Sequence, residues 1–177
     1  GTVTLASAMN LNGTGQDLTI TQGTLDLAGF NFTVNDVLTV DASGTLQLEG
    51  GETTVSYNTF TLNTGSTILY DGGGNYTGLK MGNAYENLSF DNAGGTWSLN
   101  AALDVNSNLT ITNGTLDVSV TDFQINVAGN WNNSGTLTAR SGTVVFDGTD
   151  QAIIGSTTFN NFSKTESIND ATDATLT

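Results

Sequence analysis

Apolar and polar residues alternate in short runs along most of this chain. In "GTLDL" at 23–27 and "GTLDV" at 114–118, the second and fourth residues after the glycine are apolar. A second alternating run ends just before this motif, as in Leu18 and Ile20, and a third follows it, as in Phe32 and Val34. Period-two alternation is typical of strands with one buried face. The pattern therefore predicts three short strands around each motif.

The motif itself, a glycine followed by Thr or Ser, recurs every 20 residues or so, at Gly1, Gly23, Gly44, Gly65, Gly95, Gly114, Gly135 and Gly155. Three strands with their turns take up about 20 residues, and a fixed period of this size is typical of solenoids. We therefore predict an all-β parallel β-solenoid (β-helix) of about eight coils of ~21 residues, with three short strands per coil and little or no helix.

The motif also predicts which side chains face inward. The expected pairs are Val3 and Leu5, Leu25 and Leu27, Leu46 and Leu48, Trp97 and Leu99, and Leu116 and Val118. In the fourth coil the same count places Leu69 inward. The glycine makes the corner, where a positive φ is tolerated.

A longer repeat overlies the short one. "NLTITNGTLDV" at 108–118 copies "DLTITQGTLDL" at 17–27, "TVVFDG" at 143–148 echoes "TILYDG" at 67–72, and "FNNFSK" at 159–164 echoes "YENLSF" at 85–90. The start of the chain matches the segment from residue 95 onward. These matches predict two homologous solenoid modules, 1–94 and 95–177, each of about four coils. The segment "DGGGNYTG" at 71–78 is interpreted as a loop that bulges from one coil.

The segments "FNNFSKT", "NLTITNGTLDV", "VAGNWNNSGT" and "GTVVFDGTDQAI" resemble the tandem repeats of large secreted bacterial surface proteins. They are similar to the filamentous-haemagglutinin and autotransporter-like β-helix adhesins. The resemblance implies a structural repeat module of an extracellular protein, such as an adhesin stalk or a filament subunit.

The composition excludes several classes of binding partner. The net charge is −14, with only Lys80, Arg140 and Lys164 as basic side chains against 17 acidic ones. Binding of nucleic acid or of an anionic membrane needs clustered basic residues, so neither is expected. No apolar run is long enough to span a bilayer. The expected partners are the chain itself, through end-to-end stacking or covalent neighbouring repeats, and glycans or other cells.

Candidate chemistry is sparse. The chain lacks His and Cys, so no Ser-His-Asp or Cys-His arrangement and no zinc site of the usual kind can form. The acids are spread along the sequence, and Arg140 and the two lysines show no pairing with an aspartate. Asp147 and Asp150, and Asp170 and Asp173, are oxygen ligands that calcium could use, but we interpret them as solvated surface acids. We predict no enzymatic activity, no cofactor, and no catalytic or metal site.

Two alternative functions remain open. The first is a carbohydrate-binding or carbohydrate-cleaving β-helix, whose site would lie at the 71–78 insertion near Tyr70 and Tyr76. Trp97 and Trp131 could also stack on sugars, but their positions favour the core. The second is an ice-binding solenoid, which needs a regular double column of hydroxyls. The motif supplies only one such column.

The two ends of the sequence begin and stop near the same phase of the repeat. Open strand edges at both ends of a solenoid template further pairing. We therefore expect end-to-end continuation, either by a second copy or by covalent neighbours.

Overall fold

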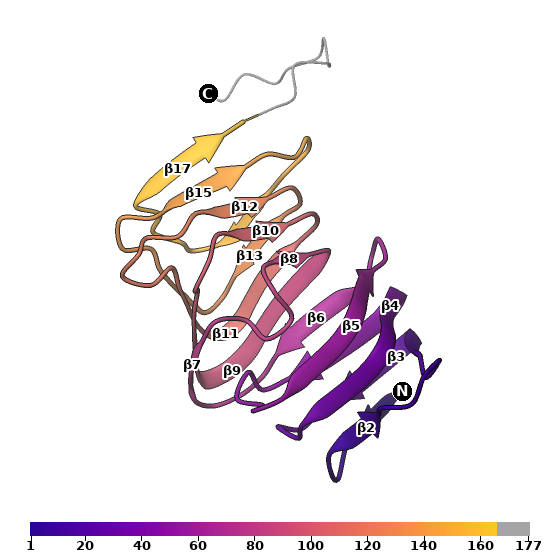
Figure 1. Ribbon diagram of the computed structural model, residues 1–177. Coiled ribbons are helices and arrows are strands. Elements are labelled where there is room, and N and C mark those ends of the chain that lie inside the picture. The colour runs from indigo at the N-terminus through magenta and orange to yellow at the C-terminus, as the bar shows by residue number, and fades with distance from the viewer. Residues whose placement is uncertain (166–177) are drawn as a thin grey trace.

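The computed structural model describes residues 1–165, and these form a β-solenoid of about eight turns without any helix (Figure 1). A larger sheet of twelve strands and a smaller one of five make up the walls. The strands are β1 (Thr2–Thr4), β2 (Met9–Leu11), β3 (Leu18–Asp26), β4 (Phe32–Leu48), β5 (Val55–Leu62), β6 (Thr67–Tyr70), β7 (Asn75–Thr77), β8 (Ala84–Tyr85), β9 (Asn87–Ser98), β10 (Leu103–Val105), β11 (Leu109–Asp117), β12 (Ile125–Val127), β13 (Trp131–Asn133), β14 (Thr136–Thr138), β15 (Thr143–Phe146), β16 (Ile153–Gly155) and β17 (Asn161–Lys164).

Each strand pairs in parallel with strands of the neighbouring coils, as the repeat predicts. One wall runs through all the coils in the order β1-β3-β4-β6-β9-β11-β13-β16, and we call it the shared wall. The long strands β3, β4, β9 and β11 turn corners, so each contributes to more than one wall.

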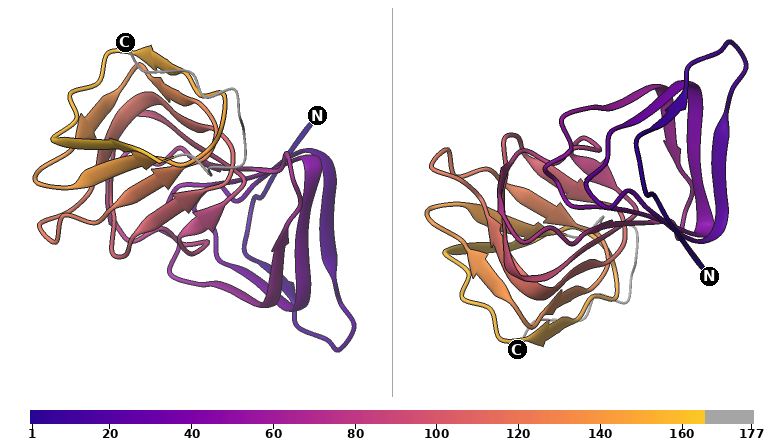
Figure 2. Two further views of the ribbon diagram at one scale, coloured as in Figure 1. Left: turned by 90° about the horizontal axis from the view of Figure 1, so that it is seen from above. Right: turned by 90° about the horizontal axis from the view of Figure 1, so that it is seen from below.

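The other walls do not run through the whole molecule. In the first stack they consist of segments of β2 to β5, and they end at β5. In the second stack they begin afresh at β7 and β8 and continue to β14 and β17. Seen along the axis, the two stacks are triangles displaced sideways (Figure 2). We call the change between them, at residues 71–86, the step.

The step changes which strand of the repeat lies in the shared wall. In the first stack this wall holds the motif strands, up to Thr67–Tyr70. In the second stack it holds the strands that precede the motif, because Asn87–Phe90 pairs with Thr67–Tyr70 and Leu88–Phe90 then pairs with Leu109–Ile111. The apolar face stays on the same side throughout. The division into homologous modules at residue 94 rests on the sequence repeat and stays a prediction.

The core is the column of inward side chains from every wall. The predicted inward pairs of the second, third, fifth and sixth motifs are all buried. The first pair differs: Leu5 is only half-buried and Val3 is 64 % exposed, because β1 is the outermost strand of its wall. The prediction that Leu69 faces inward is wrong. Ser66 is an extra residue after Gly65, so Thr67 pairs with Thr45, Ile68 and Tyr70 face inward, and Leu69 faces outward.

The corner glycines are required by conformation and by space. Gly23 and Gly114 have φ values of 75° and 85°. A Cβ on Gly114 would also overlap the carbonyl oxygen of Asn92, in the neighbouring coil. Any other residue would therefore force the coils apart at this corner.

We expect Gly114→Ala to lower the free energy of unfolding by about 1–3 kcal/mol, because it adds positive-φ strain and a backbone clash. Gly73→Ala is the matched control, since its Cβ would make only ordinary contact with Asn92 at 3.5 Å. It should change stability by less than about 0.5 kcal/mol. Urea denaturation followed by fluorescence measures both, and equal effects would refute the role given to this corner.

Candidate functional site

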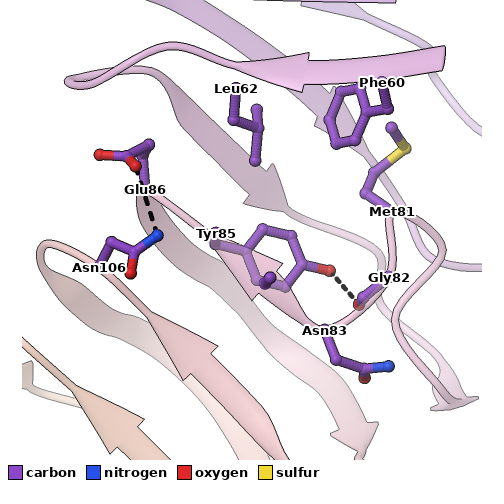
Figure 3. Close-up of a pocket in the computed structure, with 9 residues that line it drawn as sticks. Phe60, Leu62, Met81, Gly82, Asn83, Tyr85, Glu86 and Asn106 are labelled. Atoms are coloured by element: carbon purple, nitrogen blue, oxygen red, sulfur yellow. Dashed lines mark hydrogen bonds between the residues drawn. The ribbon is translucent and has the colours of Figure 1, made fainter.

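The step leaves a groove between the end of one stack and the start of the next. Its volume is about 360 Å³. Figure 3 shows Phe60 and Leu62 of β5 on one side, facing Met81 and Tyr85 on the other. Glu86 and Asn106 lie at one rim, where the Asn106 amide donates to a Glu86 carboxylate oxygen at 3.4 Å. The groove exists because no described strand pairs with the outer edge of β5.

Two tyrosines fix the floor of this groove. The Tyr85 hydroxyl donates to the Gly82 carbonyl oxygen at 2.7 Å, and the Met81 amide donates to the Tyr70 hydroxyl at 3.1 Å. The two hydroxyls lie 3.2 Å apart. Since the Tyr85 proton is engaged with Gly82, the Tyr70 hydroxyl donates to Tyr85. The chain of bonds holds the turn at 79–85 against the last coil of the first stack.

Burial raises the pKa of both phenols. Tyr70 is fully buried, and desolvation is the main cause of its raised pKa. Desolvation also raises the pKa of Tyr85 well above its ordinary value, with the neighbouring Tyr70 as the next cause. Both hydroxyls therefore stay neutral under physiological conditions. They act as hydrogen-bonding groups that hold the step together.

Four carboxylates meet at the corner where the first stack leaves the shared wall, and we call them the acid corner. They are Asp26, Glu49, Glu52 and Asp71. Desolvation is the main cause of the raised pKa of Glu49, followed by the charges of Glu52, Asp71 and Asp26. Desolvation likewise raises the pKa of Asp71, although a hydrogen bond from Gln47 opposes it.

Much of the acid corner supports the backbone. Glu52 is buried, and its carboxylate accepts from the amides of Glu49 at 2.7 Å and Gly50 at 2.9 Å. Asp71 accepts from the Gln47 amide at 2.7 Å. The acids are spread along the sequence, yet the fold brings these four together. The signal of this cluster was present, since Asp26, Glu49 and Asp71 each lie about one coil apart.

The "DGGGNYTG" segment is more than a bulging loop. Residues Asn75–Thr77 form β7, which pairs with β9 and starts a wall of the second stack. Tyr76 stacks on Trp97, and Tyr70, proposed as part of a sugar site, is completely buried. Trp97 and Trp131 are also completely buried, so the prediction that they belong to the core is confirmed.

Arg140 is paired, contrary to the sequence analysis. Its guanidinium donates to the two oxygens of Asp117 at 2.6 and 2.7 Å. These hydrogen bonds are the main cause of the lowered pKa of Asp117. A hydrogen bond from the backbone amide of Ser119 lowers this pKa further. The two residues lie about one coil apart, and this is why linear sequence did not reveal the pair.

The structure describes only one of the two aspartate pairs that were considered as calcium ligands and interpreted as solvated surface acids. Asp147 and Asp150 are exposed in the turn after β15. Asp170 and Asp173 lie outside the described residues. Within residues 1–165, no group of three or more acidic side chains has the geometry to hold a metal ion.

The predicted single column of hydroxyls is divided between two walls. Thr2, Thr24, Thr45 and Thr67 align in the shared wall, and Asn87 continues that column. Thr96, Thr115 and Thr136 align on a different wall. Each column is short, so the geometry adds no support for ice binding.

An asparagine ladder runs along the second stack at the start of its shared-wall strands. The side-chain amide of Asn87 donates to the Ser66 carbonyl oxygen at 3.0 Å. Asn87 Oδ1 accepts from both the backbone and the side-chain amide of Asn108 at 3.2 Å. Asn108 Oδ1 then accepts from the backbone amide of Asn130 at 2.9 Å, and Asn130 Oδ1 accepts from the backbone amide of Ala152 at 2.7 Å. The ladder joins the last coil of the first stack to every coil of the second.

No protein-family model, curated protein or solved structure matches this chain. Within the described residues there is no helix of the length and apolarity needed to cross a membrane. What the geometry establishes is a β-solenoid with a repeat arrangement, a groove at its step and an acid corner beside it.

We expect Tyr85→Phe to lower the free energy of unfolding by about 1–3 kcal/mol, because it removes the hydrogen bond to the half-buried Gly82 carbonyl and leaves the buried Tyr70 hydroxyl without an acceptor for its proton. Tyr57→Phe is the control, on a half-buried ring of β5. Thermal and urea unfolding should separate the two variants. If both lose the same stability, the tyrosine network does not hold the step.

We expect the contribution of Asp117 to depend on pH. Arg140 lowers the folded-state pKa of Asp117, so protonation favours unfolding. The stabilisation is present above the ordinary carboxyl pKa of about 4 and is lost as pH falls through the lower folded-state pKa. Asp117→Asn should therefore be less stable than the wild type near neutral pH, and the difference should shrink in acid.

Denaturation of wild type and Asp117→Asn at several pH values measures this difference. Glu49 and Asp71 have raised pKa values and respond to pH in the opposite sense, but they are common to both proteins and cancel. Asp104→Asn, at an exposed position of β10, is the control. A gap between wild type and Asp117→Asn that is independent of pH would contradict the role of the ion pair.

Proposed function

We propose that this chain is a structural repeat module of an extracellular bacterial surface protein, either an adhesin stalk or a filament subunit, which continues end to end. The observation that carries the proposal is the shared wall, which is hydrogen-bonded without interruption through eight strands. Such a wall transmits tension along its length through many parallel hydrogen bonds. A stalk or fibre needs this property, whereas a ligand site does not.

The surface chemistry supports the same proposal. The net charge of −14 keeps a rod with open edges soluble, because like-charged surfaces repel. The resemblance of the repeats to those of filamentous-haemagglutinin and autotransporter-like adhesins points in the same direction. No enzymatic activity, cofactor, nucleic-acid partner or membrane insertion belongs to the proposed role.

A second candidate function is a carbohydrate-binding or carbohydrate-cleaving β-helix. The acid corner favours it, because Glu49 and Asp71 are neighbouring carboxyl groups with raised pKa values. A raised carboxyl pKa is what a general acid requires. Against it, Glu52 and Asp71 are engaged in bonds that stabilise the corner.

Antibodies against the chain should label intact, unpermeabilised cells of the source organism. Labelling that appears only after permeabilisation would overturn the extracellular assignment. A glycan array separates the two candidates: the structural module should show no selective binding. Selective binding or cleavage that is lost in Glu49→Gln and retained in Asp104→Asn would establish the carbohydrate function instead.

A further inference from the structure

The last described strand repeats the start of the second stack. β17 pairs with β15 in the register Thr143↔Asn161 and Phe146↔Lys164. β9 pairs with β6 in the same register, Thr67↔Asn87 and Tyr70↔Phe90. The sequences agree as well, since "TVVFDG" and "FNNFSK" echo "TILYDG" and "YENLSF". β17 is therefore placed as the first strand beyond a second step.

Asn161 also repeats the first rung of the asparagine ladder. Its amide donates to the Ser141 carbonyl oxygen at 3.0 Å, as that of Asn87 does to Ser66 at 3.0 Å. At the internal step, Asn87 Oδ1 accepts from Asn108 of the next coil. Within residues 1–165 no donor reaches the equivalent oxygen of Asn161. Asn161 Oδ1 can therefore accept a hydrogen bond from a further coil, as Asn87 Oδ1 does from Asn108.

The apolar face of β17 is uncovered in the part of the chain that the structure describes. Phe162 is 43 % exposed, whereas the equivalent Leu88 is completely buried between Ile68 and Leu109 of the neighbouring coils. Phe162 packs on one side against Phe146 and Phe159. Its other side corresponds to the side of Leu88 that Leu109 covers.

The coil that would cover β17 has a counterpart at the beginning of this chain. At the internal step the covering strand is "NLTI" at 108–111, and its counterpart is "DLTI" at 17–20. The outer edge of Leu18–Ile20 has no partner among the described residues. Beside it lies an apolar pocket of about 320 Å³, lined in part by Leu5, Met9 and Leu18.

We propose that the outer edge of β17 binds the strand Leu18–Ile20 of a second copy, in the register of the internal step. The inference rests on the proposed structural function and names the contact that extends it. Phe162 then pairs with Leu18, Ser163 with Thr19 and Lys164 with Ile20, while Asn161 Oδ1 accepts from the amide of Asp17. Each copy is displaced sideways from the last, so the filament is stepped.

Lys164 limits the strength of this contact. It occupies the place of Phe90, and its ammonium group donates to the Gly148 carbonyl oxygen at 2.5 Å. An inward-pointing lysine on an edge strand disfavours further pairing. We therefore expect the copies to associate weakly and in a concentration-dependent way, so that a disulfide bond between copies is needed to detect the contact.

Cysteine cross-linking tests the register, because the chain has no native cysteine. Thr19→Cys with Ser163→Cys in the same full-length chain should give a ladder of covalent multimers under oxidising conditions. Paired residues in a parallel pair lie about 5 Å apart, within reach of a disulfide. Thr21→Cys with Ser163→Cys is the register control, since two residues of offset place the Cα atoms about 8 Å apart, beyond that reach.

A ladder in the first variant that reducing agent reverses, with little in the control, supports the proposal. No ladder in either variant, or equal ladders in both, overturns it. Surface labelling is unaffected by this outcome, so failure of the contact is distinguishable from failure of the proposed function.

A second measurement does not depend on cysteine geometry. Phe162→Asp should raise the concentration at which the otherwise native chain self-associates in sedimentation velocity by at least tenfold. Val120→Asp is the matched control, because Val120 is 84 % exposed in the turn after β11, away from both ends. If Phe162→Asp associates as the wild type does, β17 is not the contact.

Discussion

The structure depends on hydrogen bonds between coils, because the strands of one coil make none with each other. Where two coils are neighbours, the backbone N–H and C=O groups of a wall pair with those of the adjacent coil, as in the run of pairs from Thr2 through Thr24 to Thr45. Buried backbone groups must be paired. The folding of each coil therefore depends on the coils next to it. The inward side chains form columns, because in-register parallel pairing places equivalent positions of successive coils above each other.

The step preserves this constraint while it changes the cross-section. Only the shared wall remains paired through it, from Tyr70 to Phe90, and the other two walls end and begin again. The outer edges of β5 and β8 stay unpaired among the described strands, and the two stacks are joined by the Tyr70–Tyr85 contact and by Asn87, which reaches back to Ser66. The groove between the stacks follows from this geometry and is an intrinsic feature of a stepped solenoid.

Polar residues at the corners act in the same way. Asp26 and Asp117, the third residues after the motif glycines, accept from the amides of Ala28 and Ser119 two residues further on. Those two residues have positive φ values of 47° and 61°. An aspartate that bonds its own backbone stabilises such turns. The recurrence of "GTLD" is thus explained by a corner glycine, a ladder threonine, a buried leucine and a turn aspartate, all of them structural roles.

The sequence by itself determined the period, the parallel pairing and most of the core, because glycine spacing and period-two alternation are local properties that every coil repeats. It also placed Trp97 and Trp131 in the interior. It misjudged Leu69, since one extra residue at a corner, Ser66, reverses which side chains face inward. Only the tertiary structure decided the step, the acid corner and the Arg140–Asp117 pair. The step depends on which strand of the repeat lies in the shared wall. The acid corner and the ion pair depend on which residues of different coils come into contact, and such contacts join residues about one coil apart in the sequence.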